Sequence, residues 1–479
     1  MPFLPELKHW ATVSPHVAAV SDGTRSLNYA QLLQAAQEAA ASPAAARACG
    51  PAGSVQVIEG NSVLELAGQW CAALLTGRMV MVLDPAWPQA VRQALRAAAK
   101  AWASEHLGSD GERGPNPRFL LGLSSGTSGM PKGFVRHADS WRESFRQSTR
   151  FFGIAPGSVI LAPGPQAASM NLYALGESLY AGASFVSMPR FSPAAAVAAL
   201  HHHGATHLVV VPTLLELVAS CGLHTRADTS TLQRIICAGA AVGAPTLEAV
   251  RDWVPQAVVQ QYYGAAELGF VAASAVGRTA PHAGDPFPGV RWSVRDGSGT
   301  ALEQGQLGTI CVQSPYLCAG YAWGDDGLAF QPLGPGDSPA LEAAQPWFTV
   351  HDQGWIDSAG SLHLAGRASD MMLVSGANVY PHPIEAVLGA AAAREVVVTG
   401  VPDPLRGQRV AAAILAPRTG AQKNSLAACR QAAAALPAVQ RPTRWYALTA
   451  LPATGSGKID RALLAQWIEQ GDSRVRSLQ

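Results

Sequence analysis

Short apolar runs alternate with longer alanine-rich segments along about the first 280 residues of the chain. The apolar runs have the length and spacing of strands: Ser54–Ile58, Met79–Leu83, His207–Val211, Leu232–Cys237 and Ala257–Tyr262. The segments between them favour helices, because alanine has the highest helix propensity: Tyr29–Ala41, Gln89–Ala103 and Pro193–His203. This alternation predicts an α/β body with largely parallel sheets layered with helices.

The pattern changes after about residue 280, where Gly, Pro and Asp separate shorter strand-like runs. These runs predict a small β-rich subdomain that closes the large body: Gly289–Val294, Gly308–Gln313, Trp347–Val350 and Ser361–Leu364. A new α/β unit starts near Ala368, with strands Met371–Val374, Glu395–Val401 and Val410–Leu415, a helix from Pro383, a helix through Ala435 and a short tail. We therefore predict a large N-terminal domain over residues 1–367 and a small, mobile α+β domain over residues 368–479.

Composition and charge narrow the classes of function. The chain has 479 residues, of which 48% are hydrophobic and 14% charged, as expected of a globular protein with a large core. A net charge of +1 provides no basic surplus for nucleic acid or for an anionic membrane, so small molecules or another protein are the expected partners. Seven cysteines without CxxC pairs, and no apolar run long enough for a membrane span, favour a cytoplasmic protein.

The first chemical signal is a loop of glycines and hydroxyl residues, Ser-Ser-Gly-Thr-Ser-Gly-Met-Pro-Lys-Gly, from Ser124 to Gly133. Glycines let backbone N–H groups approach an anion closely, hydroxyls add donors and Lys132 adds a positive charge. The loop therefore favours phosphate binding, with a surface turn as an equally weighted alternative for the loop by itself. It is not a P-loop, because Gly133 stands where that motif needs Ser or Thr.

Four further motifs are weak when taken singly. Gln261–Glu267 offers an aromatic side chain for a nucleobase and a carboxylate for Mg²⁺, whereas a solvated helix start is its plain alternative. Small residues in Ile236–Ala241 would admit a flat ligand or would simply pack tightly. The segment Thr349–Asp357 offers a carboxylate that could accept ribose hydroxyls, and the following Gly366–Arg367 pair offers a guanidinium that could reach a phosphate or the same ribose. The plain alternative is an aspartate in a β-turn and an arginine on the surface.

The fifth motif of the chain is a Gly/Ser-rich loop, Leu451–Arg461, that carries Lys458. A lysine on such a loop is suited to delivery into a distant site, although a lysine near a chain end is usually exposed to solvent. It also fails the P-loop pattern, because Ile459 follows Lys458.

In this order, the five motifs resemble those of the adenylate-forming superfamily of acyl-CoA synthetases, carrier-protein-loading adenylation domains and luciferases. The resemblance covers roughly Tyr29–Arg461, and the joint order is far more specific than any one motif. It implies a large N-terminal and a small C-terminal domain that rotates between two half-reactions. A carboxylate first attacks the α-phosphate of MgATP to give acyl-AMP and pyrophosphate, and a thiol then attacks the acyl-AMP.

The resemblance also implies nucleotide-binding roles. The phosphate loop would embrace the β- and γ-phosphates through Ser124, Ser125, Gly126, Thr127, Ser128, Gly129 and Lys132. Tyr263, followed by Gly264, would stack on adenine. The other face of the ring would be lined by Gly239, Ala240 and Ala241.

The implied catalytic groups are charged. Glu267 would bind Mg²⁺, and Asp352 would hold the ribose with the assistance of Arg367. Lys458 would bridge the substrate carboxylate and the α-phosphate, while Lys132 supports the outgoing phosphates. Such charges are needed because two anions must meet, and their repulsion must be offset where charge develops.

The chain departs from the family pattern at several positions. Ala266 stands where Thr is usual, His351 where Gly is usual, and Ser369 where the hinge commonly has Asp or Lys. The segment Pro163–Met170 lacks the His or aromatic residue that many relatives place in the acyl pocket. These departures concern rate and substrate more than reaction type.

The residues expected around the acyl group are apolar and small, and no charged side chain stands out to pair a substrate amine. A fatty or aryl acid is therefore preferred over an amino acid. The expected pocket residues are Ala167, Ala168, Met170, Ala240, Ala265, Leu268 and Phe270.

The acceptor that we expect is coenzyme A. The segment Val374–Pro381, with Gly376, resembles the family loop that lines the pantetheine tunnel, and no carrier domain follows Lys458. A stand-alone enzyme that loads an acyl carrier protein would look nearly the same. A degenerate, non-catalytic adenylate-binding relative is the third alternative, suggested by the departures at Ala266, His351 and Ser369.

Overall fold

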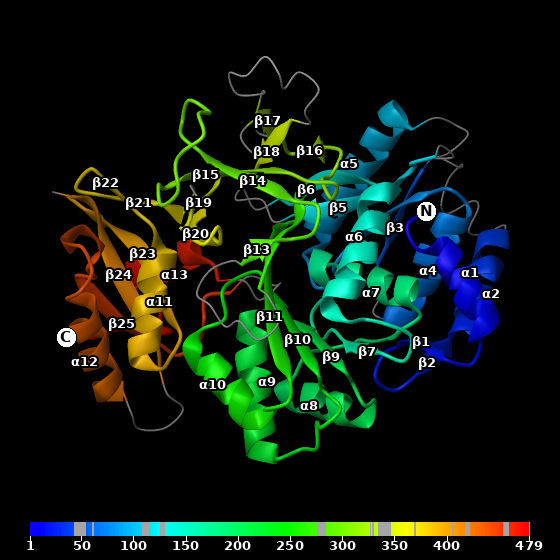
Figure 1. The fold of residues 1–479 in the computed structure, drawn as a ribbon, viewed down its shortest axis with the longest axis horizontal. Helices are drawn as coiled ribbons and strands as arrows, with labels where there is room; N and C mark the ends of the chain where they lie inside the picture. Colours follow the sequence, from blue (N-terminus) through cyan, green and yellow to red (C-terminus); the bar gives the residue numbers. More distant parts are fainter. Residues whose placement is uncertain are drawn as a thin grey trace.

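The computed structural model describes residues 1–42, 54–59, 62–107, 115–124, 130–274, 284–325, 327, 330–333, 346–367, 370–404, 406–416, 422–453 and 459–478. Within them the chain forms a large body of two sheets covered with helices, an antiparallel sheet and a separate C-terminal sheet, arranged from right to left in Figure 1. The predicted α/β class with parallel-rich sheets is confirmed.

The first sheet has a parallel centre with antiparallel strands at both edges. Its order among the described residues is β13 (Asp285–Pro286), β12 (Gly269–Ala273), β11 (Val258–Ala265), β10 (Arg234–Ala238), β9 (His207–Val210), β7 (Val159–Leu161), β8 (Ser184–Val186), β1 (Ala18–Ser21) and β2 (Ser26–Asn28). Neighbouring strands from β11 to β1 are parallel, because helices connect them across the faces of the sheet. Three of those helices are α8 (Pro193–His202), α9 (Pro212–Thr225) and α10 (Ala244–Trp253).

The second sheet is shorter and is parallel only at its β3–β4–β5 side. Its order is β16 (Tyr321–Trp323), β6 (Lys132–His137), β5 (Arg118–Ser124), β4 (Met79–Val82) and β3 (Val55–Ile58). Strand β16 comes from far along the chain and pairs antiparallel with β6, Tyr321 opposite Phe134. The helix α5 (Gln89–His106) covers the outer face of this sheet.

Both sheets are buried on two faces, and they share a central core. In β10, Ile236 packs into the central cluster while Ile235 packs under α8, α9 and α10. In β4, Val80 joins the central cluster while Met81 packs under α5. Alternate residues of a strand point to opposite faces, so the continuous apolar runs of these strands reflect burial on both sides.

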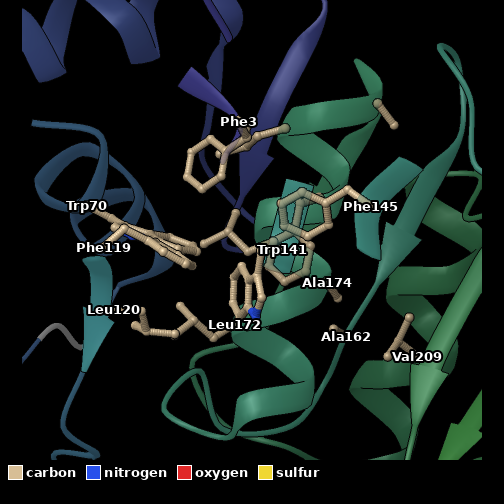
Figure 2. Packing of buried hydrophobic residues seen from close by; sticks show 14 of the residues in the cluster. Phe3, Trp70, Phe119, Leu120, Trp141, Phe145, Ala162, Leu172, Ala174 and Val209 are labelled. Carbon is tan, nitrogen blue, oxygen red and sulfur yellow. The ribbon is translucent and has the colours of Figure 1, made fainter. Parts of the chain in front are cut away.

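A layer of helices fills the space between the two sheets. The layer is made by α1 (Leu4–Val13), α2 (Tyr29–Ala41), α4 (Val63–Leu75), α6 (Ala138–Phe152) and α7 (Ser169–Ala181). Figure 2 shows Trp141 and Phe145 of α6 among the rings of this core. Trp141 lies edge-on to Phe119, with their ring centroids 5.1 Å apart. Helix α2 starts where predicted, because the side chain of Asn28 and that of Gln31 cap each other's backbone N–H groups.

The β-rich subdomain is antiparallel. Its order is β17 (Gln331–Leu333), β18 (Trp347–Thr349), β15 (Gly308–Gln313), β19 (Asp352–Ile356) and β20 (Leu362–Arg367), with β14 (Arg291–Arg295) also paired to β15. Strands β19 and β20 form a hairpin in which Asp352 lies opposite Arg367. The predicted β-rich character after about residue 280 is therefore confirmed.

The C-terminal sheet, yellow to red in Figure 1, has the order β22 (Ala377–Val379), β21 (Met372–Val374), β24 (Gly407–Leu415), β25 (Arg444–Leu448) and β26 (Val475–Leu478), with β23 (Val396–Asp403) also paired to β24. Its helices are α11 (Pro381–Ala392), α12 (Gln422–Ala433), the short 3₁₀ turn η3 (Ala438–Gln440) and α13 (Arg461–Gln470). The expected short tail after Ala435 is wrong, because β25, α13 and β26 all lie there. The unit packs on β20 and α10 through α11.

No helix in the described part of the chain is long and apolar enough to cross a membrane. The six cysteines that the structure describes are free thiols.

Candidate active site

A cavity of about 830 Å³ opens where strands of both large sheets end. Its lining includes Val82 at the end of β4, Ser124 at the end of β5, Val211 after β9 and Gly239 after β10. The carboxyl ends of parallel strands in a doubly covered sheet are the usual place for a ligand, since connecting loops gather there. Residues from several of the sequence motifs line this one cavity.

Ser124 and Lys132 flank the Ser/Gly-rich loop and lie opposite each other in the β5–β6 hairpin. Both line the cavity. The loop positions Ser125, Gly126, Thr127, Ser128 and Gly129 lie outside the described residues. Strand β16 braces this hairpin: the Trp323 indole donates a hydrogen bond to the Pro131 carbonyl at 3.1 Å, and the Lys132 ammonium lies 5.4 Å from the centre of the Tyr321 ring.

Glu267 lies in the turn between β11 and β12, is buried and lines the cavity. The Tyr321 hydroxyl donates a hydrogen bond to its carboxylate at 2.8 Å. Tyr321 therefore contacts both charged groups, Lys132 through its ring and Glu267 through its hydroxyl. One residue of β16 thus fixes the lysine of the first motif and the glutamate of the second relative to each other.

Gly264 lines the cavity just before this turn. A Cβ at this position would lie 2.3 Å from the carbonyl oxygen of Gly269, far inside van der Waals contact. The close approach of β11 and β12 therefore requires glycine at residue 264, and it brings the Glu267 turn against the cavity.

Arg136 is a charged cavity residue that lies outside the sequence motifs. Only 3% of it is exposed, and its guanidinium donates hydrogen bonds to the backbone carbonyls of Tyr316 and, at 2.6 Å, of Ala266. Burial lowers the pKa of this arginine, and the nearby Cys318 and Glu267 oppose that effect. The alternation of side chains along β6 could have indicated that Arg136 faces inward. Phe134 and Arg136 both line the cavity, while Val135 between them packs under α5.

Asp352 and Arg367 are brought together by the β19–β20 hairpin, with Arg367 Nε 3.6 Å from Asp352 Oδ1. The Tyr263 hydroxyl donates a hydrogen bond to Asp352 Oδ2 at 2.6 Å. Burial raises the pKa of the Asp352 carboxyl, while Arg367 and the Tyr263 hydroxyl hold the rise back. Within the described residues Asp352 Oδ1 is buried without a hydrogen-bond partner, which leaves an acceptor for a ligand donor.

His351 precedes this aspartate and lines the cavity. Its backbone has φ +61°, the left-handed region in which glycine is strain-free, and this accounts for the usual glycine at the position. Its Nε2 is buried, and the described part of the chain offers it no hydrogen-bond partner. His351 therefore adds a polar side chain to the lining, whereas Asp352, the next residue along the chain, is not itself among the lining residues.

Other predicted site residues lie near the cavity or away from it. Gly239 lines it with φ +93°, whereas Ala240 and Ala241 are exposed just beyond and are not among its lining residues. Tyr263 does not line this cavity either, and reaches the site through Asp352. Gly376 sits in the two-residue β21–β22 turn, which has φ +51° at Ser375 and +81° at Gly376. Lys458 and Ser369 lie outside the described residues.

The acyl pocket was predicted to be apolar. The expected residues that line the cavity are Ala167, Ala168, Met170, Ala265 and Phe270. Leu268 is instead fully buried in the central core, and Ala240 is not in the lining. The lining also contains Ser144 and Tyr173 from the central helices, polar groups that the sequence motifs did not indicate.

Comparison with known proteins identifies relatives along most of the chain. The model of the AMP-binding enzyme family matches residues 92–322, and that of the AMP-binding enzyme C-terminal domain matches residues 384–458. An uncharacterized acyl-CoA ligase of Bacillus subtilis (strain 168), YhfT, is 32% identical over 361 residues, which are 74% of this chain and 70% of that protein. ScoC of Streptomyces coeruleorubidus, a fatty acid–[acyl-carrier-protein] ligase, is 30% identical over 400 residues, 79% and 73% of the two chains.

The fold has counterparts among solved structures. The amide bond synthetase McbA from Marinactinospora thermotolerans superposes with a TM-score of 0.79 at 25% identity, over 97% of this chain and 100% of that one.

Proposed function

The chain belongs to the AMP-binding enzyme family of adenylate-forming acid ligases, and from that premise we propose that it converts a fatty or aryl acid to acyl-AMP and then to a coenzyme A thioester. The observation that carries the proposal is that Lys132, Glu267 and Arg367 line one cavity at the strand ends, and that Arg367 is paired to Asp352, which is not itself among the lining residues. Few other reactions need a cation, a carboxylate and a ribose acceptor in that arrangement.

The nucleotide fits the residues present. The unsatisfied Asp352 Oδ1 is a ready acceptor for a ribose hydroxyl, and Arg367, whose side chain is 52% exposed, lines the adjoining wall. The Tyr263 hydroxyl holds the aspartate from behind. In this proposal the Tyr263 ring and the Gly239–Ala241 backbone flank the adenine, and Ser124 to Lys132 embrace the outer phosphates.

A magnesium ion also fits. Glu267 presents a carboxylate to the cavity, held by the Tyr321 hydroxyl, and oxygen ligands of this kind are those that Mg²⁺ prefers. When bound, the ion would neutralise charge on the phosphates. The protein's part is to fix the Glu267 carboxylate, and Arg136 contributes by holding the Ala266 carbonyl next to it.

The chemistry that we propose is an in-line attack of the substrate carboxylate on the α-phosphate, with pyrophosphate leaving. Lys132 and the donors of its loop stabilise the departing charge, and Lys458 aligns the carboxylate with the phosphate. The role of Lys458 rests on the resemblance. A described contact lies close to it in sequence: Arg461, just after the lysine loop, pairs with Asp370 at 3.3 Å and with Glu385 at 2.6 Å.

That contact bears on the proposed division into residues 1–367 and 368–479. Asp370 is the first described residue after Arg367, so its pairing with Arg461 ties the start of the C-terminal unit to the helix that follows Lys458. We propose that Lys458 moves with this unit between the two half-reactions, while the nucleotide stays with Asp352.

Coenzyme A is the proposed acceptor, with the Gly376 turn near its pantetheine arm. The second candidate is the thiol of an acyl carrier protein, which is favoured by the similarity to a fatty acid–[acyl-carrier-protein] ligase. The same acyl-AMP would react with either thiol, so an experiment has to identify the acceptor.

The test measures pyrophosphate release with ATP, Mg²⁺ and a panel of fatty and aryl acids, followed by mass spectrometry of thioesters formed with coenzyme A or with a carrier protein. Asp352→Ala is expected to raise KM for ATP at least about tenfold, because a charged acceptor in a buried site is lost. Glu105→Gln, which alters an exposed carboxylate at the end of α5, is the matched control. Absence of pyrophosphate with every acid would contradict the proposal and support a non-catalytic adenylate-binding protein.

A further inference from the structure

Helices α6 and α7 share a line of hydrogen-bonded side chains beside the cavity. Ser144 and Ser148 lie one turn apart on α6, and Tyr173 and Glu177 lie one turn apart on α7. The Tyr173 hydroxyl is 2.7 Å from the Ser144 oxygen and 2.8 Å from the Ser148 oxygen. Ser148 in turn donates a hydrogen bond to the Glu177 carboxyl group. The four groups therefore form one continuous relay.

The relay has one end in the cavity and the other in the core. Ser144 and Tyr173 line the cavity, whereas Ser148 and Glu177 are buried and are not among its lining residues. Burial raises the pKa of Glu177 to about 8, opposed only by the bond from Ser148. A buried carboxyl between two helices is destabilising unless it is hydrogen-bonded. A pair of apolar side chains would hold the two helices together equally well, so packing alone does not explain the carboxyl. None of the four groups has a part in the adenylation chemistry described above.

The free position of the relay faces the cavity. Each hydroxyl has one proton to donate and two lone pairs that accept. If Glu177 is protonated, the donors can run from Glu177 through Ser148 and Tyr173, and the Ser144 proton is left for the cavity. If Glu177 is ionised, every donor points toward it, and Ser144 offers a lone pair. A ligand hydroxyl can meet either arrangement, because it both donates and accepts.

Aromatic walls surround the same region. The Tyr173 ring lies 5.1 Å from that of Trp141 and 5.3 Å from that of Phe270, centroid to centroid, and all three residues line the cavity. These walls suit the faces and edges of a flat ring. The Arg136 guanidinium is close enough to Tyr173 to interact with it electrostatically, and this positive charge disfavours a substrate ammonium group.

We propose that Ser144 and Tyr173 recognise a hydroxyl group on the acyl part of the acid, so that the preferred substrate is a hydroxylated aromatic acid rather than an unsubstituted fatty acid. This inference rests on the proposed function. It names the substrate class of the same site and assigns Ser144 and Tyr173 as specificity-determining residues, with Ser148 and Glu177 as the positioning residues behind them.

The experiment compares acids in matched pairs. Benzoic, phenylacetic, 3-phenylpropanoic and cinnamic acids are each tested against their ring-hydroxylated counterparts, together with octanoic acid and aromatic dicarboxylic acids. The readout is kcat/KM from pyrophosphate release. We expect at least one hydroxylated acid to exceed its partner by on the order of 10–100-fold, because the unsubstituted acid leaves a buried polar group unpaired.

Variants then locate the preference. Tyr173→Phe and Ser144→Ala should lower kcat/KM about tenfold or more for the hydroxylated acid while leaving the unsubstituted partner within about threefold of wild type, because only the hydroxyl contact is lost. Ser140→Ala is the matched control: Ser140 lines the same cavity one turn earlier on α6, but its hydroxyl donates to the His137 carbonyl at 2.8 Å. It should affect both acids equally. Melting temperatures show that each variant is folded.

The outcomes separate the two levels of the argument. If unsubstituted acids are adenylated as well as their hydroxylated partners, or if Tyr173→Phe lowers both by the same factor, the inference is overturned and the proposed function stands. Preference for a dicarboxylic acid also overturns it, in favour of Arg136 as the determinant. Absence of pyrophosphate with every acid overturns the proposed function, and the inference with it.

Discussion

Replacing Tyr263 by phenylalanine separates two duties of this residue. The ring, proposed to lie against adenine, is kept. The hydroxyl that donates to Asp352 Oδ2 at 2.6 Å is lost. The variant therefore asks whether the aspartate depends on this one donor for its charge and position.

The size of the effect follows from the partners of Asp352. A buried hydrogen bond to a charged group contributes roughly 1.5–3 kcal/mol. After its loss the carboxylate keeps Arg367 Nε at 3.6 Å, and an ion pair with a half-exposed arginine contributes at most about 1 kcal/mol. We therefore expect the free energy of unfolding at pH 8 to fall by roughly 1.5–3 kcal/mol, because the charged carboxylate is left under-satisfied.

The sign of the pH dependence can be worked out from the same contacts. Burial raises the pKa of Asp352, and the Tyr263 hydroxyl works against that rise. Without the hydroxyl the pKa rises further, so the folded variant takes up a proton at a higher pH. Stability then declines as pH rises through the enlarged interval between the unfolded and folded pKa values. The deficit relative to wild type should be larger at pH 8 than at pH 4, because proton uptake by the folded protein as pH falls removes the charge that has lost its donor.

The assay is urea unfolding at pH 4 and pH 8, together with the pH profile of kcat/KM for ATP. The acid limb of that profile should move to higher pH in Tyr263→Phe. Tyr262→Phe is the control, because its ring is next along β11 and points to the opposite face. Equal deficits at the two pH values, or an unmoved acid limb, would refute the coupling between Tyr263 and Asp352.

Three other predictions concern separate parts of the molecule. Lys458→Ala should lower acyl-AMP formation by roughly 10²–10³ but leave thioester formation from supplied acyl-AMP mostly intact, and equal loss in both assays would contradict the role of Lys458. Gly264→Ala puts a Cβ 2.3 Å from the Gly269 carbonyl oxygen and should lower both the melting temperature and adenylation, whereas Gly297→Ala, with open space around its Cβ, should preserve both. Glu177→Gln should flatten the pH dependence of stability: burial raises the pKa of Glu177 from 4.5 to about 8, so its contribution is full below the lower value and is lost toward the higher one. Urea unfolding at pH 5 and pH 8 measures that slope, which should be shallower in Glu177→Gln than in wild type.

Local patterns were enough to predict much of the fold. The helix over Tyr29–Ala41 and the strand over Gly308–Gln313 were predicted residue for residue, because a capping box and a run between turn residues mark their ends. The elements after Ala435 were missed. Strand β25 is only five residues long, and its pairing with β24, parallel and distant in sequence, is a tertiary contact that no local pattern reveals.

The candidate site also has a part that the sequence indicated and a part that it did not. Lys132, Glu267, Asp352 and Arg367 lie in contiguous motifs, so the sequence could nominate them as candidates, and the structure shows that three of them line the cavity and that Asp352 pairs with Arg367. The hydrogen-bonded relay could not be predicted from the sequence, because Ser144 and Tyr173 are 29 positions apart and meet only where α6 packs on α7. Serines spaced four apart on a helix predict a shared face, but not what the face contacts.

Strand β16 has a further consequence, for the order in which the site can assemble. Tyr321 contacts Lys132 and Glu267, which precede it by 189 and 54 positions, and Trp323 fastens the end of the phosphate loop at Pro131. During synthesis, Lys132 and Glu267, the proposed phosphate and metal ligands, are therefore made long before the strand that sets their spacing. A ribosome-bound or truncated chain that ends before Tyr321 contains both charged groups but lacks the brace between them, so competence to bind MgATP should be acquired in one late step.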